Sequence, residues 1–324
     1  MLKTILRRAL AMIPLLVAVA FCSFLLIRLA PGDFLTDLSD NPHISPETIS
    51  ALRRQYGLDQ SWYAQFTHWL LRALQGDFGH SFACNCPVSA LLAGRLLNTA
   101  LLAVAGLLLA MLIAAPLGAI AAGYGSRALD RILSFFTTLG LSMPSFLLAL
   151  LAVLLAARTG WFPIGGVRSL DYERFSTMQK IADFLHHLIL PASVLALRQV
   201  PGYLQQLRAS LLESLSQDYV LAARARGLSE GAILFKHALR NAVNPIISML
   251  GNSAGSLLSG AFVVEVILSW PGIGSLAVSS LLSRDLNALL ACLIYAAALL
   301  AFSNLIADLL LNAADPRIRR PQRI

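Results

Sequence analysis

Six long apolar runs constrain the fold of this sequence more than any other feature. Each run reaches or exceeds the ~20 residues that an α-helix needs to cross the hydrocarbon core of a bilayer. Only 13% of the residues are charged, against about 25% in soluble globular proteins. The pattern predicts an all-α integral membrane protein with six transmembrane helices, at about residues 9–30, 96–122, 132–157, 184–207, 246–269 and 287–311.

The first run could also be the core of a cleaved signal peptide, because three basic residues precede it (Lys3, Arg7 and Arg8). It is longer than the usual apolar core of about 7–15 residues, and no small-residue cleavage site follows it. We therefore expect a retained first span.

The distribution of basic residues predicts the orientation of the chain. With a cytoplasmic N-terminus, the inner segments hold fourteen lysines and arginines and the outer segments nine, as the positive-inside rule requires. Both termini are then expected in the cytoplasm. The expected segments are residues 1–30 with the first helix, an extracytoplasmic helical segment 31–95, a core 96–312 with helices two to six and a cytoplasmic loop 208–245, and a cytoplasmic tail 313–324.

The outer segment 31–95 has clear helix signals. Ser45-Pro46 is a favourable helix start, and the helix should run to about Tyr56 before Gly57. A second helix, at about 62–74, carries four aromatic residues that suit the headgroup level of a bilayer. The segment is either a cap on the outer leaflet or a platform for an extracytoplasmic partner.

A polar island at 216–229, continued to 241, separates the fourth and fifth apolar runs. Residues 216–218 form a helix start, Gly227 a stop, and Ser229 with Glu230 a second start. An ordinary positive-inside loop needs only charge, whereas this island adds repeated helix signals to four basic residues. It therefore predicts a short helix that docks in a groove of another protein.

Several enzymatic functions are not supported by the sequence. None of its three lysines follows a glycine, so the P-loop that cradles nucleotide phosphates cannot be built. If the chain takes part in ATP-driven transport, the ATPase is another polypeptide. Residues 251–255 match G-x-S-x-G literally, but they lie inside an apolar run with no strand before them. No catalytic residue is assigned, and the dispersed basic residues do not predict a nucleic-acid partner.

No metal or cofactor site is expected either. Adjacent His186 and His187 face different sides of a helix, without a carboxylate–histidine cluster around them, and are interpreted as interfacial residues. Cys84 and Cys86, in the outer segment, could form a disulfide or stay as free thiols.

Small and ionisable residues within the spans are candidates for a transport pathway. Small residues allow helices to approach closely or form a smooth pore wall, and ionisable residues inside a membrane suggest function. Glu265 and Arg198 could face a polar cavity or form interhelical ion pairs. The pathway candidates are Gly251, Ser253, Gly255, Ser259, Glu265 and Arg198.

In the polar island the chain resembles the permease subunits of ATP-binding-cassette importers. Their cytoplasmic E-A-A-x3-G loop is matched at Ala222, Ala223 and Gly227, with Leu221 at the glutamate position. The sequence 219–229 and the segment 237–242 are similar to the dipeptide/oligopeptide/nickel branch. Further landmarks of that branch follow in order, at 29–33, 56–59, 76–81, 142–146, 265 with 269–274, and 315–318.

The resemblance implies the MetI-like fold of type I importers in a bacterial inner membrane. It also implies a second homologous permease subunit, an extracytoplasmic solute-binding protein, and two ATPase subunits that bind ATP and magnesium. Helix 219–227 would couple the permease to an ATPase. The expected coupling residues are Tyr219, Ala222, Ala223, Arg224, Arg226, Gly227, Leu228 and Arg240.

The substrate expected from the resemblance is a di- or oligopeptide. Nickel or another small solute is the alternative within the same family. A self-sufficient secondary carrier is the alternative outside it, although no inverted repeat is evident and the docking island argues against a carrier.

Overall fold

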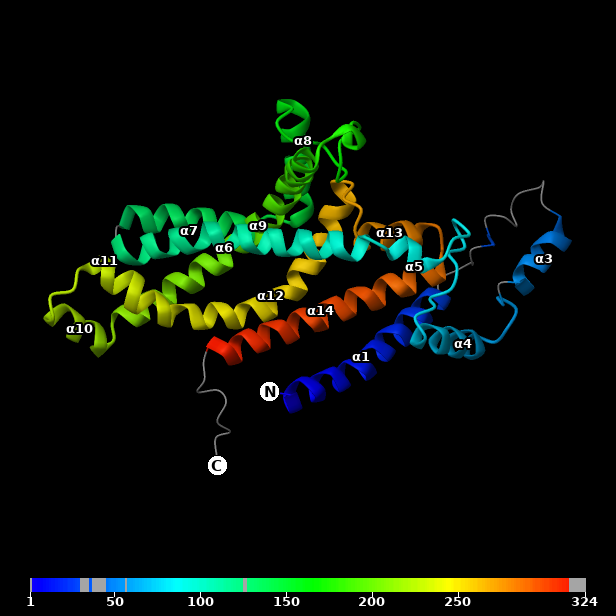
Figure 1. Ribbon diagram of the computed structural model, residues 1–324, viewed down its shortest axis with the longest axis horizontal. Coiled ribbons are helices and arrows are strands. Elements are labelled where there is room, and N and C mark those ends of the chain that lie inside the picture. Colours follow the sequence, from blue (N-terminus) through cyan, green and yellow to red (C-terminus); the bar gives the residue numbers. More distant parts are fainter. Residues whose placement is uncertain (1, 30–34, 37–44, 56, 125–126, 315–324) are drawn as a thin grey trace. The chain divides into compact units, whose positions relative to one another are not determined.

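The computed structural model describes residues 2–29, 35–36, 45–55, 57–124 and 127–314, and these residues form helices and connecting loops without a β-strand (Figure 1). The all-α prediction is confirmed for this part of the chain. The helices are α1 Leu2–Leu29, α3 Pro46–Gln55, α4 Trp62–Leu74, α5 Val88–Leu92, α6 Arg95–Tyr124, α7 Arg127–Ser142, α8 Ser145–Thr159, a 3₁₀ helix Tyr172–Arg174, α9 Thr177–Leu215, α10 Asp218–Ala225, α11 Glu230–Ala232, a π-helix Ile233–Ala238, α12 Leu239–Ile267, α13 Ile273–Leu282 and α14 Leu286–Ala314.

Several of these helices are suited to a membrane. In the described part of the chain, four are long and apolar enough to cross a bilayer, or five if the bent pair α7–α8 counts as one span. Four predicted spans correspond to α1, α6, α9 and α14. The fifth predicted run lies in α12, a helix of 29 residues whose described apolar part is Gly255–Ile267.

The span predicted at 132–157 is not one continuous helix. α7 ends at Ser142 and α8 begins at Ser145, and the two helices are bent by 102°. Pro144 occupies the N-cap of α8 in an extended conformation. Proline has no N–H for a helical hydrogen bond, and it disfavours the helical conformation of the preceding residue, Met143. The break therefore follows from a proline in the middle of the apolar run.

The described residues form two compact units. The first combines Met1–Thr99 with Pro271–Ala301, and the second combines Ala100–Trp270 with Phe302–Ile324. Of the tail predicted at 313–324, residues 315–324 lie outside the described part of the chain.

In the first unit, the helices predicted at about 45–56 and 62–74 are present as α3 and α4. The Ser45 hydroxyl accepts a hydrogen bond from the N–H of Thr48 at 3.3 Å, as expected of a helix cap. α4 packs on α1, where the ring of Phe66 contacts Phe21 and Phe24. A disulfide joins Cys84 and Cys86, which decides between the two alternatives left open by the sequence.

In the second unit, α9 packs against α7, α8 and α12. It has 39 residues and is longer than the predicted 184–207 span. A capping box formed by Ser176 and Gln179 starts it, and Pro191 and Pro201 lie within it without ending it. Leu195 of α9 is buried in the apolar core of this unit, which also contains Leu102, Ala149, Leu257 and Trp270.

Candidate functional site

The polar island folds into a short helix, α10, at the end of α9 (Figure 1). The boundaries differ slightly from the predicted ones: Ser216 caps the end of α9, Gln217 is the N-cap of α10, and α10 ends at Ala225 with Arg226 as its C-cap. Gly227 follows in the left-handed conformation, with φ +77°, and its N–H donates to the carbonyl of Arg224 at 2.9 Å. A glycine adopts this conformation at little cost, which explains the sharp stop.

One face of α10 is anchored on the protein by apolar contacts. Val220 and Ala223 are buried against Ile233 of the π-helix and the partly buried Leu215 at the end of α9. Of the residues expected to dock, Ala223 therefore packs inward. The other seven are exposed: Tyr219, Ala222, Arg224, Arg226, Gly227, Leu228 and Arg240.

The exposed side of this region carries large apolar side chains. Leu221 of α10 is 62% exposed, and Phe235 of the π-helix is 63% exposed. A π-helix is rare and often occurs at functional sites. Nothing in the sequence pattern predicted it, and Phe235 was not among the expected site residues.

A polar cluster joins α10 to the helices on both sides. The hydroxyl groups of Tyr219 and Ser214 are hydrogen-bonded, and the Asn241 side-chain amide donates to the Tyr219 hydroxyl at 3.1 Å. The Ser214 hydroxyl also donates to the carbonyl of Ala238 at 3.2 Å. These contacts connect the ends of α9, α10, the π-helix and α12. Ser214 was not among the expected site residues, because its contact with Ala238 joins positions that are 24 residues apart in the sequence.

A bidentate ion pair connects α10 to α11. The Arg224 guanidinium donates from Nε to Oε1 of Glu230 at 2.7 Å and from Nη2 to Oε2 at 3.0 Å. This hydrogen bonding holds the pKa of Glu230 below its usual value and raises the pKa of Arg224. Arg224 was expected to contact a partner protein, but here it is paired within the loop, whereas Arg226 is exposed beside it.

The expected pathway residues lie in different environments. Glu265 is fully buried, Gly255 is half-buried, and Ser259 and Arg198 are exposed. The burial and contacts of Gly251 and Ser253 lie outside the described part of the structure. α9 and α12 are also joined by a hydrogen bond from Nε2 of Gln199 to the Ser256 hydroxyl at 2.9 Å.

The adjacent histidines hydrogen-bond to backbone carbonyls. Nε2 of His186 lies 2.8 Å from the oxygen of Trp161, and Nδ1 of His187 lies 2.8 Å from the oxygen of Asp183. In the described part of the chain, no group of three or more possible metal ligands is brought together.

Two family models together match almost the whole chain. The model described as a binding-protein-dependent transport system inner membrane component matches residues 114–320. The model for the N-terminal part of such a membrane component matches residues 1–103.

Known relatives align over nearly the full length. The oligopeptide transport system permease protein AppB of Bacillus subtilis is 40% identical over 316 residues, which cover 97% of this chain and 98% of the relative. A putative peptide permease protein of Brucella suis is 36% identical over 323 residues. The glutathione transport system permease protein GsiC of Salmonella choleraesuis is 36% identical over 320 residues. Each of the last two matches covers 98% of this chain and 99% of the relative.

Proposed function

We propose, since this chain belongs to the family of binding-protein-dependent transport system inner membrane components, that it is the permease subunit of an importer for di- or oligopeptides. Membership of this family confirms the resemblance that the sequence motifs indicated. Peptides are supported as the substrate class because the similar proteins include oligopeptide and peptide permeases and one for glutathione, itself a tripeptide.

The chain is a multi-pass membrane component, and members of its family are not themselves the ATPases of the importer. We infer six spans, with both termini in the cytoplasm and residues 31–95 on the outer side, from the apolar runs and the distribution of basic residues. A second homologous permease, two ATPase subunits that bind ATP and magnesium, and an extracytoplasmic solute-binding protein would complete the importer.

The observation that carries the coupling role is the two-sided construction of α10. Its inner side is anchored by Val220 and Ala223, while Leu221 of the same helix is exposed, as is Phe235 of the π-helix. Exposed apolar side chains on an anchored helix suit docking in a groove of another protein. Leu221 stands at the usual glutamate position of this loop. We therefore expect an apolar contact, rather than a charged one, with the groove at this point.

The translocation pathway is inferred to lie along α12. Small residues recur along this helix, at Gly251, Ser253, Gly255 and Ser259. Ser259 is exposed, which supports a surface open to solute or to the second permease. Arg198 is exposed on α9 and remains a pathway candidate. The burial of Glu265 favours a structural position for that carboxyl group within this subunit.

The coupling role is tested by substituting the exposed apolar side chain. Leu221→Asp should reduce copurification of the ATPase subunits with a tagged permease and lower the ATP-dependent uptake of a labelled dipeptide into proteoliposomes by tenfold or more. A charged group placed in an apolar contact is unfavourable because it loses its hydration. The matched control is Leu282→Asp, because Leu282 is also exposed but lies in α13.

Two results would contradict the proposal. Normal ATPase copurification and uptake in Leu221→Asp would exclude α10 as the docking element. Dipeptide uptake by this chain alone, without ATPase subunits, would instead indicate a self-sufficient carrier.

A further inference from the structure

The first unit contains a cavity that the transport role does not explain. It has a volume of about 240 Å³ and lies between α3, α4 and the first turn of α14. Polar and aromatic side chains from all three helices line it, chiefly Arg54, Gln65, His68, Trp69, Arg72 and Asn287.

α4 presents two different faces. Gln65, His68, Trp69 and Arg72 recur at the spacing of one helical face, and all of them line the cavity. On the opposite face, Tyr63 and Leu74 are 62% and 70% exposed. Such aromatic and aliphatic residues suit the outer leaflet, since α4 packs on the membrane-spanning α1. The cavity on the other face would then open to water rather than to lipid.

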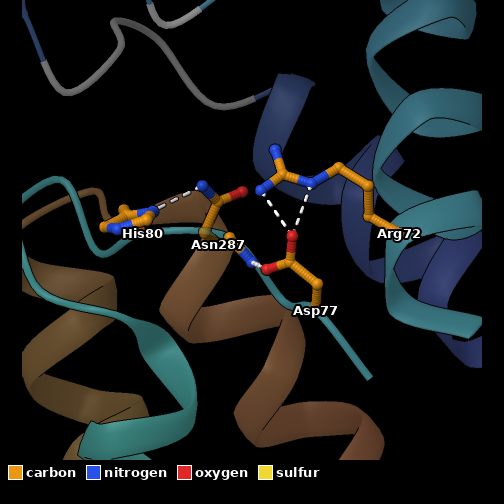
Figure 2. Close-up of polar contacts among 5 residues, drawn as sticks. Arg72, Asp77, His80 and Asn287 are labelled. Carbon is orange, nitrogen blue, oxygen red and sulfur yellow. Dashed lines mark hydrogen bonds and ion pairs between the residues drawn. The ribbon is translucent and has the colours of Figure 1, made fainter. Parts of the chain in front are cut away.

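The charged groups of the cavity leave it with a net positive charge. Arg72 donates two hydrogen bonds to Oδ2 of Asp77, at 2.9 and 2.7 Å, and Figure 2 shows these side chains pointing toward one another. Oδ1 of Asp77 accepts from the N–H of Gly79 at 2.8 Å. These contacts keep the pKa of Asp77 below its usual value, so this carboxylate is ionised and already paired.

Arg54 provides the second positive charge. Its Nε donates to the carbonyl of Ser50 at 3.4 Å, and within the described part of the chain no carboxylate pairs with its guanidinium group. The cavity thus has two guanidinium groups and one carboxylate.

One of the side chains that line the cavity, Trp69, has an unpaired donor. Trp69 is only 7% exposed, and among the described residues its indole N–H has no hydrogen-bond partner. A buried N–H without a partner is unfavourable, and the indole nitrogen can only donate. Asn287 is held in place because its amide nitrogen donates to the carbonyl of His80 at 2.9 Å (Figure 2).

We propose that this cavity binds the carboxylate of a small solute, of the size of an amino acid or the end of a peptide. Arg54 supplies the charge, and the indole N–H of Trp69 gains an acceptor when a small shift of the ring brings it to the ligand. A ligand pocket commonly has about 300–1,000 Å³, so this cavity suits one terminal group rather than a whole oligopeptide. The inference goes beyond the transport role, and binding can be measured without ATP.

The test uses the complete permease–ATPase complex in nanodiscs, without nucleotide or solute-binding protein. Alanyl-alanine and its C-terminal amide are titrated calorimetrically. The dipeptide should bind and the amide should bind at least tenfold more weakly, because only the former has a carboxylate. Arg54→Gln should weaken dipeptide binding at least tenfold, and Trp69→Phe severalfold. Arg158→Gln, the same change at an exposed arginine at the end of α8, should have less than a twofold effect.

A second measurement locates the ligand. In complexes labelled with 5-fluorotryptophan, the fluorine signal lost in Trp69→Phe identifies Trp69. This signal should shift when alanyl-alanine is added and should not shift in Arg54→Gln. A constant signal, equal binding of the amide, or unchanged binding in Arg54→Gln would overturn the proposal.

Other anions and other sources of a carboxylate are tested in the same complexes. If inorganic phosphate binds more tightly than the dipeptide, the proposal that the cavity recognises a carboxylate is wrong. If the free dipeptide does not bind, but Arg54→Gln weakens binding of the solute-binding protein, the site accepts a protein side chain and the proposal of a free solute is wrong. Uptake by the wild type, measured separately, distinguishes any of these results from failure of the transport role.

Discussion

The side-chain amide of Asn241 donates a hydrogen bond to the hydroxyl of Tyr219 over 3.1 Å, and the same hydroxyl contacts Ser214. Asn241 lies near the start of α12, Ser214 near the end of α9 and Tyr219 in the first turn of α10. α9 and α12 pack along one another in the second unit. A displacement of α10 would therefore be transmitted to both long helices through one phenol group.

Removing that hydroxyl should impair coupling without releasing the ATPase. We expect Tyr219→Phe to lower the number of dipeptides transported per ATP hydrolysed by about fivefold, since a hydrogen bond contributes about 1 kcal/mol. Copurification of the ATPase should remain normal, because the apolar anchor and Leu221 are unchanged. Tyr172→Phe, in the 3₁₀ helix between α8 and α9, is the control. An unchanged transport ratio would show that the phenol hydroxyl does not couple the helices.

The ion pair between Arg224 and Glu230 should stabilise the turn between α10 and α11. Arg224→Glu places two like charges together, so hydrogen–deuterium exchange at residues 218–232 should accelerate. The double variant Arg224→Glu/Glu230→Arg should restore most of the protection. Arg226→Glu is the matched control, because Arg226 forms no ion pair within the described part of the chain. Equal acceleration in Arg224→Glu and Arg226→Glu would contradict a specific role of the pair.

The pH dependence of this turn follows from the same contact. The pKa of Glu230 is lowered in the folded protein, so the pair stabilises the turn above the ordinary value of 4.5. The stabilisation is lost progressively as pH falls below that value and through the lowered pKa of the folded state. Protection, after correction for intrinsic exchange, should therefore be constant between pH 6 and 8 and should decrease in acid. A decrease already at pH 6 would assign the protection to another group.

Gly227 should be replaceable by asparagine but not by valine. Its φ of +77° is unfavourable for most side chains, while no atom lies within 4 Å of an added Cβ. The cost is therefore conformational, roughly 1–2 kcal/mol for a β-branched residue and less for asparagine. We expect Gly227→Val to reduce ATPase copurification at least fivefold and Gly227→Asn to retain most of it. Equal loss in both variants would indicate that the surface of the turn, rather than its backbone conformation, is required.

Local signals in the sequence were sufficient for many of the helices. Ser45-Pro46 predicted the start of α3, and Gly57 its end, because caps and glycine stops depend on neighbouring residues alone. Gly227 predicted the stop after α10 for the same reason. The apolar runs predicted α1, α6, α9 and α14, since a bilayer requires a minimum length of apolar helix.

Features that depend on distant residues were not predicted. The inward position of Ala223 results from packing on Leu215 and Ile233, and its spacing alone also fitted a docking face. The contact of Tyr219 with Asn241 requires two helix ends to meet. A proline alone also does not predict whether a helix of a membrane protein continues or ends. Pro191 and Pro201 lie within α9, whereas Pro144 lies between the end of α7 and the start of α8. Neighbouring helices decide whether the backbone groups freed by a proline find new partners.

Close packing of the loop at Gly165 provides a stability prediction for the second unit. A Cβ at Gly165 would lie 2.7 Å from the backbone oxygen of Leu268, and a backbone atom cannot move aside as a flexible side chain can. Gly165→Ala should therefore destabilise the protein by about 1–3 kcal/mol, the usual cost of overpacking. Gly231→Ala is the control, because nothing lies within 4 Å of its added Cβ. Thermal unfolding of the purified complex in detergent should show a lower midpoint for Gly165→Ala alone, and equal midpoints for both variants would show that the loop relaxes around the added methyl group.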